Sequence, residues 1–219
     1  MKFFILLASL FIANSSFAVN YVVGEGSEFK MYSEKTEPVN LSIYVTESSF
    51  TKLGVEYYFA AGGIFGVELW QQFGLAIQDK TLSLDEGYIL SNNMKKAEIM
   101  TPEFLKNNKG GVQIEDFFFS KMGEIEKFKI GIEKIEVPAG YITCTHYQKM
   151  RDDQTIDFWI SDKAGAMGLV KLISQGKKDK NHNYRIELQA LIKNVKAKIN
   201  KKEAVPLSEK GRLFLDPKL

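Results

Sequence analysis

Cysteine is nearly absent from this sequence, since Cys144 is the only one among 219 residues. A single thiol cannot form an internal disulfide, whereas a secreted eukaryotic domain of this size usually carries several. The scarcity of cysteine therefore argues against a disulfide scaffold. Combined with the N-terminal leader described below, it favours a bacterial envelope protein.

An excess of charge is also missing. The chain has 29 Lys and Arg residues against 27 Asp and Glu residues, which leaves a net charge of +2. A protein that binds a nucleic-acid backbone needs a basic excess gathered on one face, so we expect no nucleic-acid partner. The hydrophobic share of 45% and the charged share of 26% are typical of a globular domain with an apolar core.

No apolar run is long enough to span a bilayer as a helix. The run at residues 3–12 follows Lys2 and precedes small residues at Ser16 and Ala18, which is the pattern of a signal peptide. We therefore predict a leader over residues 1–18, cleaved after Ala18, and a mature chain in the periplasm without a transmembrane span. Val19 follows in place of a cysteine, so we expect no lipid anchor. An N-terminal anchor helix is the alternative.

Catalytic and metal-binding motifs are missing as well. The sequence has no G-x-S-x-G motif, and its only histidines are His146 and His182. Cys144 and His146 would share one face of a strand, but no further ligand follows at a recognisable spacing. We interpret them as a buried free thiol beside a hydrogen-bonded histidine, and His182 as a solvated loop residue. We expect no catalytic residue, no metal and no cofactor.

What the sequence does contain is a series of β-type segments. Residues 39–46 alternate, with Leu41, Ile43 and Val45 on one face, and residues 52–60 are rich in β formers. We expect these two segments to pair. Residues 21–32 predict one strand or two short ones, and further strands are predicted at residues 81–90, 112–119 and 126–137.

The block from residue 135 to residue 192 predicts an antiparallel meander. A Pro-Gly turn at residues 136–140 precedes strands at 141–147, 156–160, 169–174 and 184–192. The alternation places four residues toward the core: Ile156, Phe158, Ile186 and Leu188.

Two segments have helical character. Phe65, Leu69 and Phe73 recur every four residues, so we read residues 62–77 as an amphipathic helix that covers the sheet, with a lid over a pocket or a pair of strands as alternatives. Thr101, Pro102 and Glu103 form the cap and first turn of a second, short helix.

These elements predict an α+β, mostly β protein. We expect a single antiparallel curved sheet, a half-barrel, with one or two helices packed on its concave face. The domain would cover residues 19–195. A Lys-rich C-terminal tail would follow at residues 196–219, as a solvated strand edge, a frayed end or a contact for anionic lipid.

Three phrases in the last third of the chain resemble periplasmic half-barrel proteins. They are Val137-Pro138-Ala139-Gly140, Trp159-Ile160-Ser161 and Leu169-Val170-Lys171. The group that they resemble is the LolA/LolB-like lipoprotein-carrier fold with related uncharacterised periplasmic families. The resemblance implies a curved sheet that holds an apolar ligand. The arginine that locks the carrier's lid has no counterpart here, because none of Arg151, Arg185 and Arg212 stands in a matching context.

We therefore expect a non-enzymatic protein that binds a lipid or acyl chain between the sheet and residues 62–77, and the 16 Phe and 9 Tyr residues agree with such a site. The residues expected to line it are Phe65, Leu69, Phe73, Phe158 and Ile186. The alternative is a structural or protein-interaction module of the envelope, with a filled core and no ligand cavity.

Overall fold

The computed structural model describes residues 21–34, 36–61, 66–78, 81–107, 125–151, 154–165, 168–176 and 183–215. The predicted leader, the predicted strand at 112–119, Phe65 and His182 lie outside these ranges.

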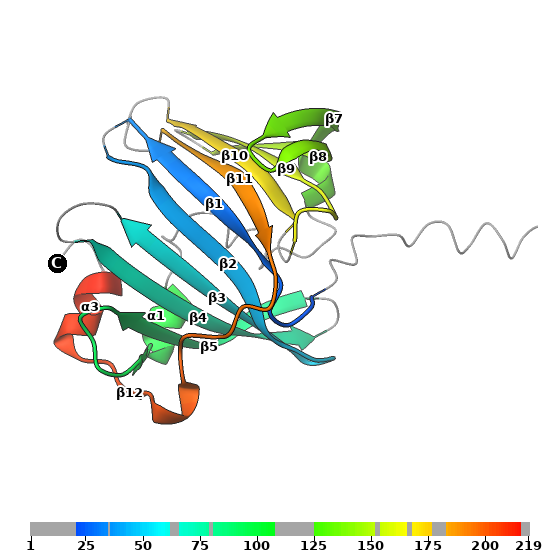
Figure 1. Ribbon diagram of the computed structural model, residues 1–219. Helices are drawn as coiled ribbons and strands as arrows, with labels where there is room; N and C mark the ends of the chain where they lie inside the picture. The colour runs from blue at the N-terminus through cyan, green and yellow to red at the C-terminus, as the bar shows by residue number, and fades with distance from the viewer. Residues whose placement is uncertain are drawn as a thin grey trace, which may run out of the picture.

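The described residues form one curved, unclosed sheet, in the order β12-β6-β5-β4-β3-β2-β1-β11-β10-β9-β8-β7 (Figure 1). Its strands are β1 (Gly26–Ser33), β2 (Val39–Ser48), β3 (Lys52–Ala61), β4 (Val67–Gln78), β5 (Thr81–Ser91), β6 (Glu98–Ile99), β7 (Lys129–Val137), β8 (Gly140–Arg151), β9 (Gln154–Ile160), β10 (Leu169–Gly176), β11 (Tyr184–Ile192) and β12 (Val205–Pro206). Within the described ranges every strand pair is antiparallel except β12 with β6. The predicted mostly β half-barrel is thereby confirmed.

One face of the sheet is apolar, because residues of alternating polarity place their apolar members on the same side. On β2, Leu41, Ile43 and Val45 are buried, as the sequence predicts. The four residues predicted to face the core in the meander, Ile156, Phe158, Ile186 and Leu188, are also buried. We call this side the apolar face and the opposite side the polar face.

Residues 67–78 form strand β4, so the predicted helix at 62–77 is wrong for the part that the structure describes. Leu69 and Phe73 are four residues apart, and that spacing also puts them on one face of a strand, whose period is two. Gly74 also disfavours a helix, because glycine in a helix interior is less stable than alanine. It pairs with Glu86 of β5, and a Cβ at Gly74 would lie 2.5 Å from the Glu86 Cγ.

The hairpin of β7 and β8 turns where predicted and reaches back across the sheet. Gly140, with a φ of 112°, supplies the positive backbone angle of the turn. Beside it, the Ala139 N–H donates to the Leu188 carbonyl of β11 at 3.3 Å. The hairpin buries Val137 and Cys144 and thereby closes one end of the core.

Helix α1 (Pro102–Asn107) begins as predicted, because the Thr101 hydroxyl accepts the Phe104 N–H at 3.2 Å. It packs on β5, where Gly87 leaves room for the Leu105 side chain. The other helical elements are η1 (Ile125–Phe128), η3 (Lys201–Glu203) and α3 (Glu209–Leu215). No helix in the described part of the chain is long and apolar enough to cross a membrane.

Residues 193–207, which we call the C-terminal strap, cross from β11 to the β6 edge (orange in Figure 1). The Val195 N–H donates to the Gly24 carbonyl at 3.0 Å, and Ile199 is buried. The expectation of a frayed tail is therefore wrong for these residues, because the sheet offers them buried hydrogen-bond acceptors. The expected strand edge is present only at β12.

Candidate functional site

Four of the five residues predicted to line a ligand site lie on the apolar face. Leu69 and Phe73 stand on β4, Phe158 on β9 and Ile186 on β11. Phe73, Phe158 and Ile186 are buried members of one hydrophobic cluster, and Leu69 packs against it half-buried. The curvature of the sheet gathers these strands around a common core, although β1, β2 and β3 separate them in the sheet order.

Aromatic rings occupy both flanks of the apolar face. On one flank, the rings of Tyr57 and Phe73 meet edge to face with centroids 5.6 Å apart. On the other, Tyr147 stacks on Phe158 at 5.2 Å. Burial raises the pKa of the Tyr147 hydroxyl, which donates to Glu126 at 3.0 Å. The middle strands supply aliphatic side chains: Leu41, Ile43, Leu53, Val55, Leu172 and Leu188.

A neutral polar pair marks the β9–β10 end of this face. The Gln154 amide donates to the Ser174 hydroxyl at 2.5 Å, and both side chains are buried. Ser174 pairs with Ile156, and Gln154 lies two residues before Ile156 on the same strand, so both side chains lie on the apolar face. Neither group carries a charge, so this end of the face tolerates an uncharged polar group without the cost of burying an ion.

Two of the described helical elements, α1 and η1, meet the apolar face near its two ends. Phe104 and Leu105 of α1 pack beside β5, and Ile125 and Phe128 of η1 pack beside β8. What this face can do is therefore a matter of apolar contact. Its buried cluster consists of rings and aliphatic chains, and the buried carboxylate of Glu98, which pairs with Ile89, lies at its β6 margin.

A second cluster surrounds His146 on the other side of the β8–β9 hairpin. The His146 Nδ1 lies 3.1 Å from the Glu133 Oε1, and its Nε2 lies 2.8 Å from the Asp157 Oδ1. The ring stacks on Trp159 with centroids 4.4 Å apart, and the Trp159 indole N–H donates to Glu133 at 2.6 Å. The Gln148 amide also donates to Asp157, at 2.9 Å.

Sequence reasoning missed Glu133 and Asp157 as partners of His146. The only signal was the strand register, which pairs His146 with Trp159 and Gly131 and so places Asp157 and Glu133 beside the ring. The ring of His146 on β8 thus contacts Glu133 of β7 on one side and Asp157 of β9 on the other. The cluster therefore ties three neighbouring strands together.

The chain's single thiol, Cys144, is buried and pairs with Glu133 of this cluster in the strand register. Burial, together with the charge of Glu133, raises the pKa of the Cys144 thiol to about 11, so the neutral form persists at ordinary pH. Its Sγ lies 3.5 Å from the Ile142 carbonyl. In the described residues, no three His, Cys, Asp or Glu side chains are placed to hold a metal.

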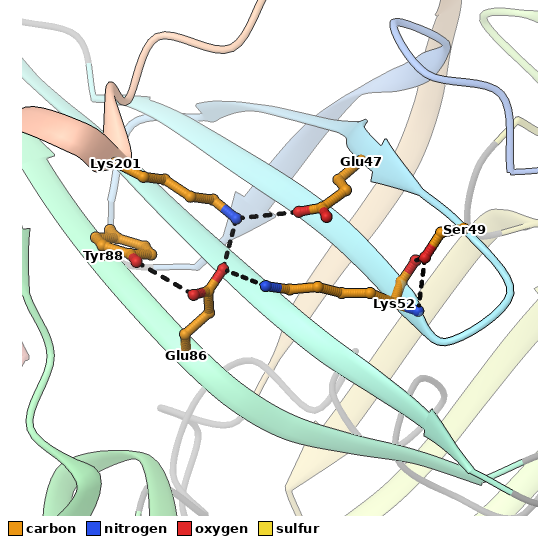
Figure 2. Close-up of polar contacts among 6 residues, drawn as sticks. All are labelled: Glu47, Ser49, Lys52, Glu86, Tyr88 and Lys201. Carbon is orange, nitrogen blue, oxygen red and sulfur yellow. Dashed lines mark hydrogen bonds and ion pairs between the residues drawn. The ribbon is translucent and has the colours of Figure 1, made fainter.

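The polar face carries a network of charges that fastens the C-terminal strap (Figure 2). The Lys201 ammonium lies 2.5 Å from Glu86 of β5 and 3.4 Å from Glu47 of β2. Lys52 of β3 reaches the same Glu86 oxygen at 3.1 Å, and Tyr88 donates to the other oxygen at 3.2 Å. Burial alone would raise the pKa of Glu86, but the hydrogen bonds and charges of Lys201 and Lys52 outweigh it and lower the pKa.

Glu56 holds the strap from beneath. Its carboxylate is fully buried and accepts the backbone N–H of Lys198 at 2.8 Å and that of Ile199 at 3.1 Å. The Tyr44 hydroxyl donates to it as well, and burial raises the pKa of that hydroxyl strongly. A carboxylate with three donors is well satisfied, so it acts as an anchor for the strap.

A scan against models of known protein families, a search of curated proteins and a search of solved structures each found no match to this chain.

Proposed function

We propose that this protein is an exported, non-enzymatic binding module that holds an apolar ligand, such as a lipid or an acyl chain, against the apolar face. The observation that carries the proposal is the common placement of Leu69, Phe73, Phe158 and Ile186 on one continuous apolar face of an unclosed sheet. An open sheet can admit a guest by separating its flanks, which a closed barrel cannot do without breaking strand pairs.

The nature of the face supports this reading. An acyl chain needs a long apolar surface and few polar groups, and the face supplies both. The resemblance to the lipoprotein-carrier fold implies a ligand of the same kind. Because residues 67–78 form strand β4, Leu69 and Phe73 belong to the wall of the half-barrel, and the ligand would contact them on the sheet itself.

Displacement of a fluorescent fatty acid tests the proposal. We expect cis-parinaric acid to bind the purified mature chain saturably and to be displaced by a non-fluorescent fatty acid. Leu69→Gln, at the half-buried margin of the face, should weaken binding about tenfold, because it replaces an apolar contact by an amide. Leu213→Gln is the matched control, since Leu213 is 57% exposed on α3, away from the apolar face of the sheet.

The outcomes separate plainly. Saturable binding that only Leu69→Gln weakens supports the proposal. Absence of saturable binding, or equal weakening by both variants, contradicts it.

Export to the periplasm is part of the proposal. It rests on the leader pattern of residues 1–18 and on the single cysteine. N-terminal sequencing of the protein from a periplasmic fraction should begin at Val19. A chain that begins at Met1 in the cytoplasmic fraction would contradict export.

A second candidate function is a protein-interaction module of the envelope. The β7–β8 hairpin favours it. Among the described strands β7 stands last in the sheet order and exposes Ile130 and Ile132, while β8 exposes Tyr141 and Met150. Exposed apolar side chains on an edge strand favour pairing with another chain. Cross-linking in the periplasm from position 132 would capture a partner if this candidate is right, and the fatty-acid probe would then fail to bind.

A further inference from the structure

A shallow depression lies at the end of the sheet, between the β5–β6 turn, β12 and α3. Its volume is about 340 Å³, and its lining includes the ammonium-bearing side chains of Lys95, Lys96 and Lys210. Met94 and Val205 add an apolar wall. The depression is remote in the sheet order from β9 and β11, which carry much of the apolar face.

The walls of the depression are held in place by backbone contacts. The Val205 N–H donates to the Ala97 carbonyl at 2.9 Å, which docks β12. The Lys210 ammonium donates to the Asn93 carbonyl at 3.0 Å, which fixes α3 against the β5–β6 turn. A ligand would therefore meet a site that is already formed.

The charge of the depression is uneven. Glu98 is its one carboxylate, and both of its oxygens already accept from Ser208: the hydroxyl at 2.7 Å and 2.9 Å, and the N–H at 2.8 Å. In the described part of the chain, no carboxylate forms an ion pair with Lys95 or Lys96, which are both exposed. The three lysines and the single glutamate of the described lining leave a formal charge of +2 around the hollow, so the local potential is positive.

We propose that this depression binds an oxyanion of the phosphate class, carried by a small ester or by a lipid headgroup. Lysine ammonium groups bind phosphate oxygens as point charges and need no fixed fork geometry, which suits an open hollow. The wall of Met94 and Val205 leaves room for an apolar substituent next to the phosphate. The site is separate from the acyl-binding face proposed above and does not depend on it.

Titration of the purified mature chain tests the site, with isothermal calorimetry and amide NMR shifts as readouts. The probes are inorganic phosphate, a soluble phosphate monoester, and vesicles of phosphatidylcholine with or without phosphatidic acid. Shift changes should centre on Lys95, Lys96 and Lys210. Lys95→Gln combined with Lys96→Gln should weaken binding about tenfold, the loss expected for two solvent-exposed charge pairs.

The control removes two charges elsewhere, with Lys134→Gln and Lys163→Gln, both of which are exposed and outside the depression. It should change the affinity less than about twofold, because distant exposed charges are screened. Thermal melts of both variants establish that they fold.

Each outcome decides. Binding of phosphate or its monoester, weakened only by the Lys95 and Lys96 changes, supports a soluble ligand. Binding only to vesicles with phosphatidic acid supports a headgroup. No binding in any arm, or equal loss in the control variant, overturns the proposal.

Discussion

At the scale of single residues, the buried carboxylate of Glu56 is the group on which the C-terminal strap depends most. It serves two backbone N–H groups of the strap, at Lys198 and Ile199, and it also accepts from Tyr44. If these buried N–H groups lost their acceptor, they would remain without a hydrogen bond, and the free energy of unfolding would fall.

Glu56→Gln should therefore lower the free energy of unfolding by about 2 kcal/mol. The amide nitrogen of Gln cannot accept the hydrogen bond from a strap N–H that a carboxylate oxygen of Glu56 accepts. Urea denaturation measures the loss, and hydrogen exchange should show faster exchange at the Lys198 and Ile199 amides. Glu68→Gln is the control, because Glu68 accepts from the Tyr58 hydroxyl on the same face but from no strap amide among the described contacts. Unchanged exchange at Lys198 and Ile199 would show that Glu56 is no anchor.

Cys144 gives a second prediction at this scale. Its pKa of about 11 lies two units above the ordinary value of 9.0, so at pH 8 the native thiolate fraction is about one hundredth of the unfolded one. Iodoacetamide should alkylate the native chain at least about 100-fold more slowly than the urea-unfolded chain at the same pH. Equal rates would mean that the thiol is neither buried nor perturbed.

How much the sequence could predict also differs residue by residue. The burial of Cys144 and the apolar positions Ile156, Phe158, Ile186 and Leu188 follow from local alternation and are confirmed. The acidic partners of His146 could not be predicted, because they depend on the register between strands and on a shift in it between Lys129 and Gly131.

At the scale of elements, the strap and β4 are the two that sequence reasoning misread. Apolar residues spaced four apart occur on one face of a helix and also on one face of a strand. The close approach of the Glu86 side chain to Gly74 across β4 and β5 agrees with the strand, and the sequence does not reveal this contact. The lysines of the strap look like a solvated tail, since a sequence does not reveal that Glu47, Glu56 and Glu86 gather beneath them.

The network around Glu86 makes the attachment of the strap dependent on pH. The pKa of the Glu86 carboxyl is lowered in the folded protein. The stabilisation by this carboxylate is therefore present above the ordinary glutamate pKa, and it is lost as the pH falls through the folded pKa. Glu86→Gln should cost about 1 kcal/mol at neutral pH, a modest amount because the side chains are partly exposed.

Urea denaturation at neutral pH and at about pH 3 measures this dependence, because the lower value lies below the ordinary pKa of a carboxyl group. The difference between the wild type and Glu86→Gln should shrink at the lower pH. A difference that stays constant over this range, or grows as the pH falls, would contradict the role of the Glu86 carboxylate.

At the scale of the whole molecule, the two faces of one unclosed sheet have different roles. The apolar face forms the core, and the polar face holds the strap and the cluster around His146. The fold class was predictable because alternation, turn residues and composition all agree on a curved antiparallel sheet. The role of each face was harder to predict from the sequence. It depends on the strand order and on the curvature that bring β4 near β9 and β11, and these are properties of the folded chain.

Leu188→Ala tests this division of faces. Leu188 is fully buried in the core cluster, so its truncation should lower the free energy of unfolding by about 3 kcal/mol. Ile132→Ala removes an exposed side chain of similar size and should change it by less than about 0.5 kcal/mol. Similar losses from both variants in chemical denaturation would mean that the apolar face is not the core.

The claim that the apolar face holds an apolar ligand is tested most directly by native mass spectrometry of the mature protein, purified from bacterial envelopes without detergent. The account predicts a bound species whose mass matches a lipid or fatty acid, lost after organic extraction and regained when an extract of the same membranes is added. A spectrum that shows only the bare chain, before extraction and after adding that extract, would contradict it.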